Sequence, residues 1–355
     1  MFRSASYGFL PKCFGSHAII GNPPYQVEGD NTRKPPIYHL FYDLSFSLSN
    51  IVSLITPGRF LFRAGQTPKK WMDKMLSDPH LKVVRYVTNS AEVFPSVDIK
   101  GGIAIIYRDA EHYFGEIGTF KVYDELESIS SKVENHADFE SGAFAELISS
   151  RGMYRFSDRL YDEYPITKEL QAKGTGNMIT SNAFELYPDV FLQSPENKEE
   201  YVQMYGRCKN DRAYRWIKHE YLVPNDYLNK YNVLIPKANG SGATGEVLST
   251  PIIGEPLTGA TDTFISIGAF ESRAEAEACL KYVKTKFART MLGILKVTQD
   301  NPKETWRLVP LQDFTSASDI DWTQEIEQID RQLYRKYGLT PQEIAFIEEK
   351  VKPMQ

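Results

Sequence analysis

One short segment of the sequence combines residue types suited to holding a flat, polar molecule. Asn22-Pro23-Pro24-Tyr25 follows directly after the apolar run of residues 18–21, which is typical of a buried strand. Proline cannot donate to a sheet ladder and fixes the backbone angle φ, so the two prolines must end the strand and stiffen the turn. The amide of Asn22 and the phenol of Tyr25 are then held at the carboxyl end of a strand, where ligands bind in open α/β sheets. A purely structural turn with a half-buried tyrosine explains the same residues equally well.

The elements after this turn predict an α/β sheet with crossover helices. Apolar residues recur at helical spacing across residues 36–49, which predicts an amphipathic helix with its apolar face on Ile37, Phe41, Leu44 and Leu48. Further strands are expected at residues 51–56, 83–87 and 102–107, with a short helix within residues 67–77. Strands that alternate with helices in this way are typical of the α/β class.

The second half of the chain has a different pattern. Charged and small residues dominate residues 124–150, so we expect a domain boundary there. Strands at 231–236 and 263–267 and one long helix at about 272–296 predict an α+β domain. Two amphipathic helices close the chain, separated by Gly338 and a Thr340-Pro341 helix start. We therefore divide the chain into residues 1–125, 126–315 and 316–355.

Composition excludes several classes of protein. The formal net charge is −5 and the pI about 5.8, so the chain is no general polyanion binder and any nucleic-acid surface must be local. Its three cysteines and six histidines have no pairing or ligand spacing, and no apolar run reaches the length of a membrane span. We expect a soluble cytoplasmic protein without disulfides or a metal site.

Two other motifs receive structural interpretations. Residues 240–245 have the spacing of a dinucleotide-binding fingerprint, but Pro251 stands where the phosphate-binding helix should run. We therefore expect a flexible loop there. Residues 35–38 resemble a proline-rich ligand for an aromatic groove, which leaves partner recruitment through Tyr38 as a weaker alternative.

Basic residues are concentrated in two segments, residues 203–240 and residues 278–299. Aromatic residues are interleaved with them in the first segment, and no acid occurs in the second. Such segments in an acidic protein predict a surface that contacts DNA phosphates, for which the candidates are Lys237, Lys284, Lys286, Arg289 and Lys296. A solvated helix face explains any single lysine among them.

Residues 19–25 resemble the catalytic motif of adenine-specific DNA methyltransferases, in the class whose target-recognition region follows the catalytic region. The resemblance continues through residues 38–48, 51–61 and 92–97 of the first half. The second half resembles the recognition domain of restriction-modification methylases, especially those with fused cleavage and methylation activities. The resemblance implies a partial Rossmann-like methyltransferase sheet, an α+β target-recognition domain and a C-terminal helical hairpin, with double-stranded DNA as the substrate.

The chemistry that the resemblance implies agrees with the residue types. The exocyclic amine of adenine is a poor nucleophile, and hydrogen bonds to the Asn22 side-chain oxygen and the Pro23 carbonyl would aim its nitrogen at the methyl group of S-adenosylmethionine. The base must leave the duplex to reach this turn. Asn22, Pro23, Pro24 and Tyr25 are the candidate catalytic residues, and Tyr25 and Phe94 are the candidate stacking faces.

One departure from the family concerns the cofactor. The family binds S-adenosylmethionine through an acidic, glycine-rich strand-turn-helix upstream of the tetrapeptide, and only 21 residues precede Asn22 here. We expect a separate polypeptide to carry the cofactor-binding or endonuclease part, or the chain to be incomplete. The alternatives are a DNA-binding specificity module without catalysis and a degenerate remnant.

Overall fold

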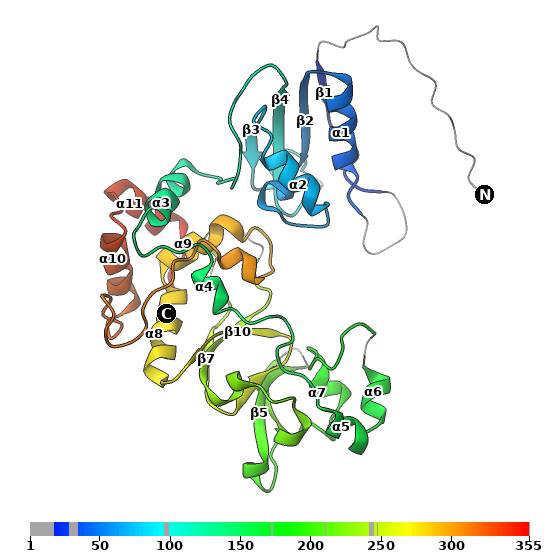
Figure 1. Cartoon of the computed structure of the whole chain (residues 1–355), viewed down its shortest axis with the longest axis vertical. Coiled ribbons are helices and arrows are strands. Elements are labelled where there is room, and N and C mark those ends of the chain that lie inside the picture. The colour runs from blue at the N-terminus through cyan, green and yellow to red at the C-terminus, as the bar shows by residue number, and fades with distance from the viewer. Residues whose placement is uncertain are drawn as a thin grey trace, which may run out of the picture. The chain divides into compact units, whose positions relative to one another are not determined.

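The computed structural model describes residues 18–27, 35–95, 99–171, 173–209, 211–240, 245–246 and 248–354. The chain forms two compact units, residues 1–120 and residues 121–355 (Figure 1). The predicted subdivision into residues 126–315 and 316–355 stays a prediction.

The first unit is built on a four-stranded sheet with the order β1-β2-β4-β3. The strands are β1 (Ile19–Gly21), β2 (Ile51–Pro57), β3 (Leu81–Val87) and β4 (Ile103–Asp109). β1 is parallel to β2, and β2 and β3 are both antiparallel to the intervening β4. Consequently β1, β2 and β3 run in one direction, and the turns after all three lie at one edge of the sheet.

Helix α1 (Tyr38–Leu48) makes the crossover between the parallel strands β1 and β2, as the pattern predicted. Its buried residues are Tyr38, Tyr42 and Ser45. The predicted apolar face is wrong for Leu44 and Leu48, which are exposed. The reason is that the aromatic rings of α1 pack against Phe60 and Trp71, which fill the core better than the leucines would.

Helix α2 (Lys69–Leu76) lies between β2 and β3 and buries Trp71, Met75 and Leu76, which confirms the predicted short helix. A 3-10 helix, η1 (Gly58–Phe62), follows β2 directly, and a second one, η2 (Ser90–Glu92), follows β3. Both short helices therefore lie at the edge of the sheet that also holds the Asn22 turn.

The second unit contains two three-stranded sheets. The first has the order β6-β5-β9, and the second has the order β10-β7-β8. The strands are β5 (Tyr201–Cys208), β6 (Asp211–Lys218), β7 (Tyr231–Pro236), β8 (Ile252–Gly254), β9 (Thr258–Ala260) and β10 (Phe264–Phe270). Strands β7 and β10 confirm the two strands expected from the sequence.

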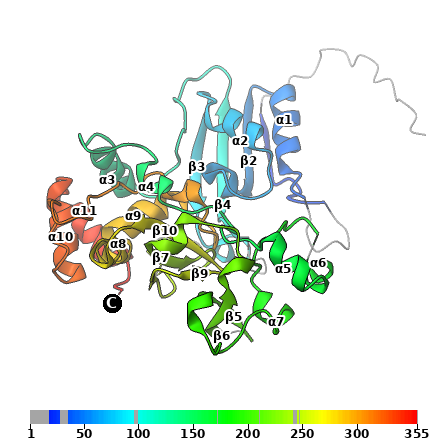
Figure 2. The ribbon, with the colours of Figure 1, turned by 60° about the horizontal axis from the view of Figure 1, so that its bottom comes forward.

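Along the chain, the helices of the second unit come before and after the strands of these sheets (Figures 1 and 2). Short ones come first: α3 (Asp124–Glu134), α4 (Ala143–Glu146), α5 (Asp158–Glu163), α6 (Ile166–Leu170) and α7 (Ala183–Leu186). The predicted long helix is two helices, α8 (Arg273–Lys284) and α9 (Lys286–Leu295). Thr285 breaks it, because its backbone is extended (φ −57°, ψ 149°) and its side chain accepts from the Ala288 amide as the N-cap of α9.

The chain ends in the helical hairpin that the sequence predicted, α10 (Ile326–Lys336) and α11 (Pro341–Lys350). Gly338 has the left-handed φ of +62° expected of a helix stop. Thr340 and Glu343 form a capping box, and Glu343 also accepts from Lys132 of α3 at 2.6 Å. The hairpin thus packs into the core of the second unit.

These elements make the protein a mixed α/β structure, as expected. No helix within the described ranges is long and apolar enough to cross a membrane. The Rossmann-like character of the first sheet stays a prediction.

The carboxylate of Asp330 on α10 joins two of these helices. It is 3% exposed and accepts from the backbone amides of Lys286 and Phe287 at the start of α9, at 3.0 and 2.9 Å. Burial raises the pKa of this carboxyl to about 6, although the two amides and Arg289 act in the opposite direction. The folded protein therefore holds this proton more tightly than the unfolded chain does.

We expect the free energy of unfolding to fall as the pH rises from about 4 to about 6, by up to roughly 3 kcal/mol from this group. In Asp330→Asn this fall should disappear, although the lost acceptor lowers stability by about 1 kcal/mol at every pH. Urea unfolding at pH 4, 5, 6 and 7 measures both effects. Asp226→Asn, at an exposed aspartate, is the control. If the unfolding free energy of Asp330→Asn fell with pH as steeply as that of the unchanged protein, the raised pKa of Asp330 would be contradicted.

Candidate functional site

The Asn22 turn lies at the carboxyl end of β1, and a backbone bridge closes the loop behind it. Asn22 and Pro24 are exposed, whereas Pro23 and Tyr25 are half-buried. The Tyr25 carbonyl accepts from the Ile37 amide at 3.0 Å, immediately before α1 begins. The turn is therefore fixed at both ends, by the β1 ladder and by the start of α1.

Tyr25 holds its hydroxyl close to the Asn22 side chain. Its hydroxyl is buried and makes no hydrogen bond of ordinary geometry within the described residues. Burial raises the pKa of this phenol, and the neighbouring Asn22 side chain opposes the shift only in part. At neutral pH the phenol is protonated, so it offers a hydrogen bond to an incoming polar group.

The Phe94 ring lies next to Tyr25, and the geometry of the two rings limits how a planar ligand can fit between them. The two ring centroids are 6.5 Å apart and the ring planes meet at 66°. A planar base between two rings needs nearly parallel faces about 7 Å apart. In this arrangement a base stacks on one ring, and a sandwich requires one ring to turn.

Two further phenols of the first unit, both on α1, form hydrogen bonds with threonine side chains. The Tyr42 hydroxyl bonds to Thr56 Oγ1 at 3.0 Å, and the Tyr38 hydroxyl bonds to Thr67 Oγ1 at 2.6 Å. Burial raises the pKa of both phenols. Since Tyr38 is almost fully buried, the alternative in which it recruits a partner is not supported.

Arg59 belongs to the same edge of the sheet, and sequence reasoning assigned it no role. It lies in η1, two residues after the end of β2, and its Nε is buried without an acceptor among the described residues. Gly101 packs so closely that an added Cβ would lie 2.8 Å from the Arg59 Cβ. Because this Nε has no acceptor among the described residues, Arg59 could bind a negatively charged ligand at this edge of the sheet. The signal in the sequence was a Pro-Gly-Arg segment directly after a buried strand.

The basic residues predicted to contact DNA lie in the second unit and have other partners in most cases. Arg289 is 3% exposed and donates to backbone carbonyls, including that of Lys352 at 2.6 Å. Lys296 is 6% exposed and donates to the carbonyls of Asn239 and Thr298. Lys237 pairs with Asp262, and Lys286 pairs with Glu348. Of the five, Lys284 alone shows no side-chain partner within the described ranges. The DNA role of the other four residues stays a prediction. It would require their present hydrogen bonds and ion pairs to break.

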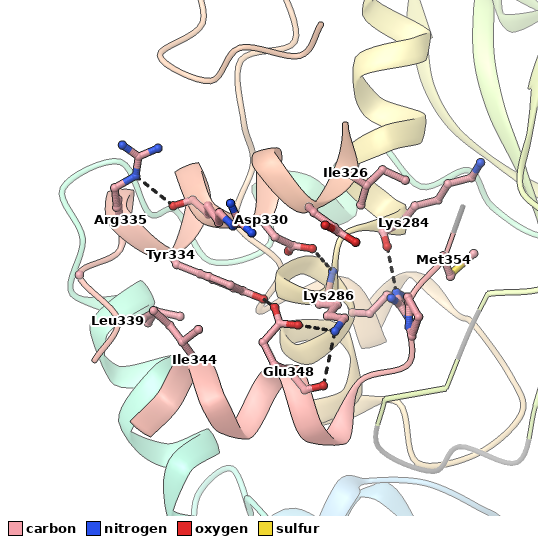
Figure 3. Close-up of a pocket in the computed structure, with 15 residues that line it drawn as sticks. Lys284, Lys286, Ile326, Asp330, Tyr334, Arg335, Leu339, Ile344, Glu348 and Met354 are labelled. Atoms are coloured by element: carbon pink, nitrogen blue, oxygen red, sulfur yellow. Dashed lines mark hydrogen bonds and ion pairs between the residues drawn. The ribbon is translucent and has the colours of Figure 1, made fainter. Parts of the chain in front are cut away.

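A large cavity lies elsewhere, between α9, α10 and α11 (Figure 3). Its volume is about 1180 Å³, and apolar side chains such as Leu339 and Ile344 line it. Its central polar groups already have partners, because Asp330 caps α9 and Glu348 binds Lys286. It carries no group poised for chemistry.

Neither a metal site nor a complete cofactor site is found in the part of the chain that the structure describes. No group of three potential metal ligands occurs there. For S-adenosylmethionine, the resemblance implies an acidic, glycine-rich strand-turn-helix. The short turn from β10 to α8 is not such a cradle, because the Ser272–Glu275 capping box already binds the first amides of α8. The described residues do not fit S-adenosylmethionine by themselves.

Comparison with known proteins agrees with the place of this site. Residues 14–94 match the family model of the Eco57I restriction-modification methylase. The matched segment contains the Asn22 turn, Arg59 and Phe94, and it supports a DNA methyltransferase role of the restriction-modification kind. No curated protein matches the chain.

We expect Gly101→Ala to destabilise the first unit more than Gly118→Ala does. Both glycines have left-handed φ angles, of +81° and +59°, but only Gly101 has neighbours within contact distance of an added Cβ. The backbone strain of about 1 kcal/mol is shared, so the difference isolates the Arg59 contact and should be at least about 1 kcal/mol. Urea unfolding measures it, and equal losses would mean that Gly101 does not position Arg59.

Proposed function

We propose that this chain carries the base-binding part of a site-specific DNA adenine methyltransferase of a restriction-modification system. The complete enzyme would transfer a methyl group from S-adenosylmethionine to the exocyclic amine of an adenine flipped out of double-stranded DNA. The observation that carries the proposal is the exposed Asn22 side chain on a proline-stiffened turn, beside the Tyr25 and Phe94 rings. The family match over the same residues supports it.

In this proposal each residue of the turn has a distinct task. The Asn22 side-chain oxygen and the Pro23 carbonyl accept the two protons of the adenine amine, which orients the nitrogen lone pair away from the ring plane. Pro23 suits this task, because its carbonyl is held on a backbone of fixed φ. Tyr25 supplies a stacking face and a protonated hydroxyl, and Phe94 would supply the second face once one of the two rings turns.

Arg59 would bind a phosphate beside the flipped nucleotide. A flipped base brings its own phosphodiester to the same edge of the sheet, and Arg59 has an unpaired buried Nε there. A guanidinium binds phosphate through two parallel hydrogen bonds. In the second unit, the exposed Lys209 at the β5–β6 turn adds positive charge for contact with the recognition site.

The methyl donor is proposed to bind in a part supplied by another polypeptide. The sheet of the first unit would then be one portion of a Rossmann-like methyltransferase sheet. The second candidate function, a DNA-binding specificity module without catalysis, is favoured by one observation, namely that the described residues do not fit the cofactor by themselves. DNA binding without methylation in the presence of such a polypeptide would distinguish it.

We expect Asn22→Ala to lower adenine methylation at least about 100-fold, because it removes one of the two groups that orient the amine. Its stability should be unchanged, since Asn22 is exposed. The assay combines the chain, a polypeptide that supplies the S-adenosylmethionine site and DNA free of N6-methyladenine, and it detects methylated bases by mass spectrometry. Asn50→Ala, at an exposed asparagine of the same unit, is the control. Methylation of cytosine, or equal activity in both variants, would overturn the proposal.

We expect Arg59→Gln to weaken DNA binding about equally for all sequences and to reduce the slope of log affinity against log salt by about one. Gel-shift titration at several salt concentrations measures both quantities. Arg63→Gln is the matched control, because Arg63 ends the same short helix, is exposed and already pairs with Asp73 at 3.0 Å. A salt slope that falls equally in both variants would remove the phosphate role of Arg59.

A further inference from the structure

The cavity between α9, α10 and α11 has an apolar wall that the protein leaves partly uncovered (Figure 3). Its volume of about 1180 Å³ is as large as that of pockets that hold small ligands, which are typically about 300–1,000 Å³. Leu339, Ile344 and Met354 line it and are only partly buried, although they pack against the core of the second unit. The wall therefore offers apolar surface to a ligand.

Charged side chains surround the same cavity, and cations outnumber acids among them. Five of the lining residues are lysines or arginines and three are acids, whereas the whole chain has a formal net charge of −5. Two of these cations, Lys284 and Arg331, have no hydrogen-bond or ion-pair partner in the part of the chain that the structure describes. Burial lowers the pKa of the Lys284 ammonium. A ligand complementary to this cavity therefore carries negative charge.

A third cation, Lys286, is enclosed, but its counter-ion is not. The Lys286 ammonium pairs with the Glu348 carboxylate, and the two side chains are 14% and 48% exposed. Figure 3 shows Tyr334, Glu348 and Lys286 linked across the cavity, and the Tyr334 hydroxyl donates to Glu348 at 3.0 Å. An enclosed ammonium needs a partner, whereas an exposed carboxylate can turn into water. An anion from solution can therefore replace Glu348.

We propose that this cavity binds a small amphipathic anion, namely a sulfonate, carboxylate or phosphate attached to an apolar body, with its charged group in the place of Glu348 at Lys286. The apolar body would lie against Leu339 and Ile344, which Figure 3 shows on the Tyr334 side of the ion pair. Such a site uses neither DNA nor the methyl donor, so it goes beyond the proposed function.

Other occupants match only half of the cavity. Double-stranded DNA carries negative charge on its backbone, but it has no flexible apolar body to cover Leu339 and Ile344. A neutral apolar molecule would cover this wall, but it would leave Lys284 and Arg331 without a counter-charge. Only a ligand with both parts satisfies the wall and the cations together.

Isothermal titration calorimetry of the full chain with 1-octanesulfonate tests the proposal. This probe is fully ionised and has a flexible apolar body. We expect saturable binding at one site. Octan-1-ol has the same body without the charge, and methanesulfonate has the charge without the body. Each should bind at least about tenfold more weakly than the probe, because each meets only one of the two requirements.

Variants at the ion pair distinguish a binding role from a structural one. Lys286→Met keeps the aliphatic stem and should weaken octanesulfonate binding at least about tenfold without changing the affinity for octan-1-ol. Glu348→Gln removes the competing carboxylate and should strengthen octanesulfonate binding at least about threefold. The matched control is Glu349→Gln, at an exposed neighbour on α11 that pairs with Lys350, and it should leave the affinity unchanged.

The outcomes are scored without any measurement of methylation, so this proposal and the proposed function can fail independently. No binding of octanesulfonate, equal affinity for octan-1-ol, or an unchanged affinity in Glu348→Gln would overturn the proposal. Sedimentation with vesicles that contain phosphatidylglycerol identifies the source of the anion. Vesicle binding that Lys286→Met abolishes would assign the site to a membrane lipid, and its absence would assign the site to a free molecule.

Discussion

Two consecutive prolines impose the constraint on which the first unit depends. Because neither Pro23 nor Pro24 can donate to the ladder between β1 and β2, the chain must leave the sheet after Gly21. β2 and β3 run in the same direction as β1 and end at the same edge, where η1 and η2 follow. The candidate site residues thus lie at one edge because of strand direction, although Asn22 and Phe94 are 72 positions apart in the sequence.

Hydrogen bonding divides the polar groups at this edge into two kinds. The Tyr38 and Tyr42 hydroxyls are satisfied by threonines and hold the fold together. Among the described residues, the Tyr25 hydroxyl and the Arg59 Nε are buried without a hydrogen bond of ordinary geometry, and each such group destabilises the folded protein by about 1–3 kcal/mol. Folding alone gives no reason to keep two unsatisfied groups at one edge. A ligand with a polar edge and a negative charge, such as a nucleotide, would satisfy both.

Local patterns in the sequence were sufficient to predict much of the secondary structure. The apolar run before Asn22, the Pro-Gly stop after β2 and the Thr340 capping box each act within a few residues, so the strand, the turn and the hairpin could be predicted. The break at Thr285 could not, because apolar spacing continues across it and only the packing of α9 selects the extended backbone there.

The predicted DNA-contacting residues could not be judged from the sequence for a different reason. Counting charges identifies basic segments, but it does not reveal that Arg289 and Lys296 are buried against backbone carbonyls of distant loops. Long aliphatic stems let such side chains enter a core when their heads find acceptors. The candidate turn at Asn22 could be recognised because its proposed chemistry depends on adjacent residues, whereas a surface for DNA would depend on tertiary packing.

The leucine face of α1 is where the sequence pattern and the packing disagree most. Spacing marked Leu44 and Leu48 as core, and the structure buries Tyr38 and Tyr42 instead, so both faces of the helix are apolar. Leu44 and Leu48 are 55% and 59% exposed, and the Asp43 carboxylate of the same helix is held by Lys74 and the Trp71 indole. Ring packing, rather than the spacing of the leucines, therefore determines which face of α1 meets the sheet.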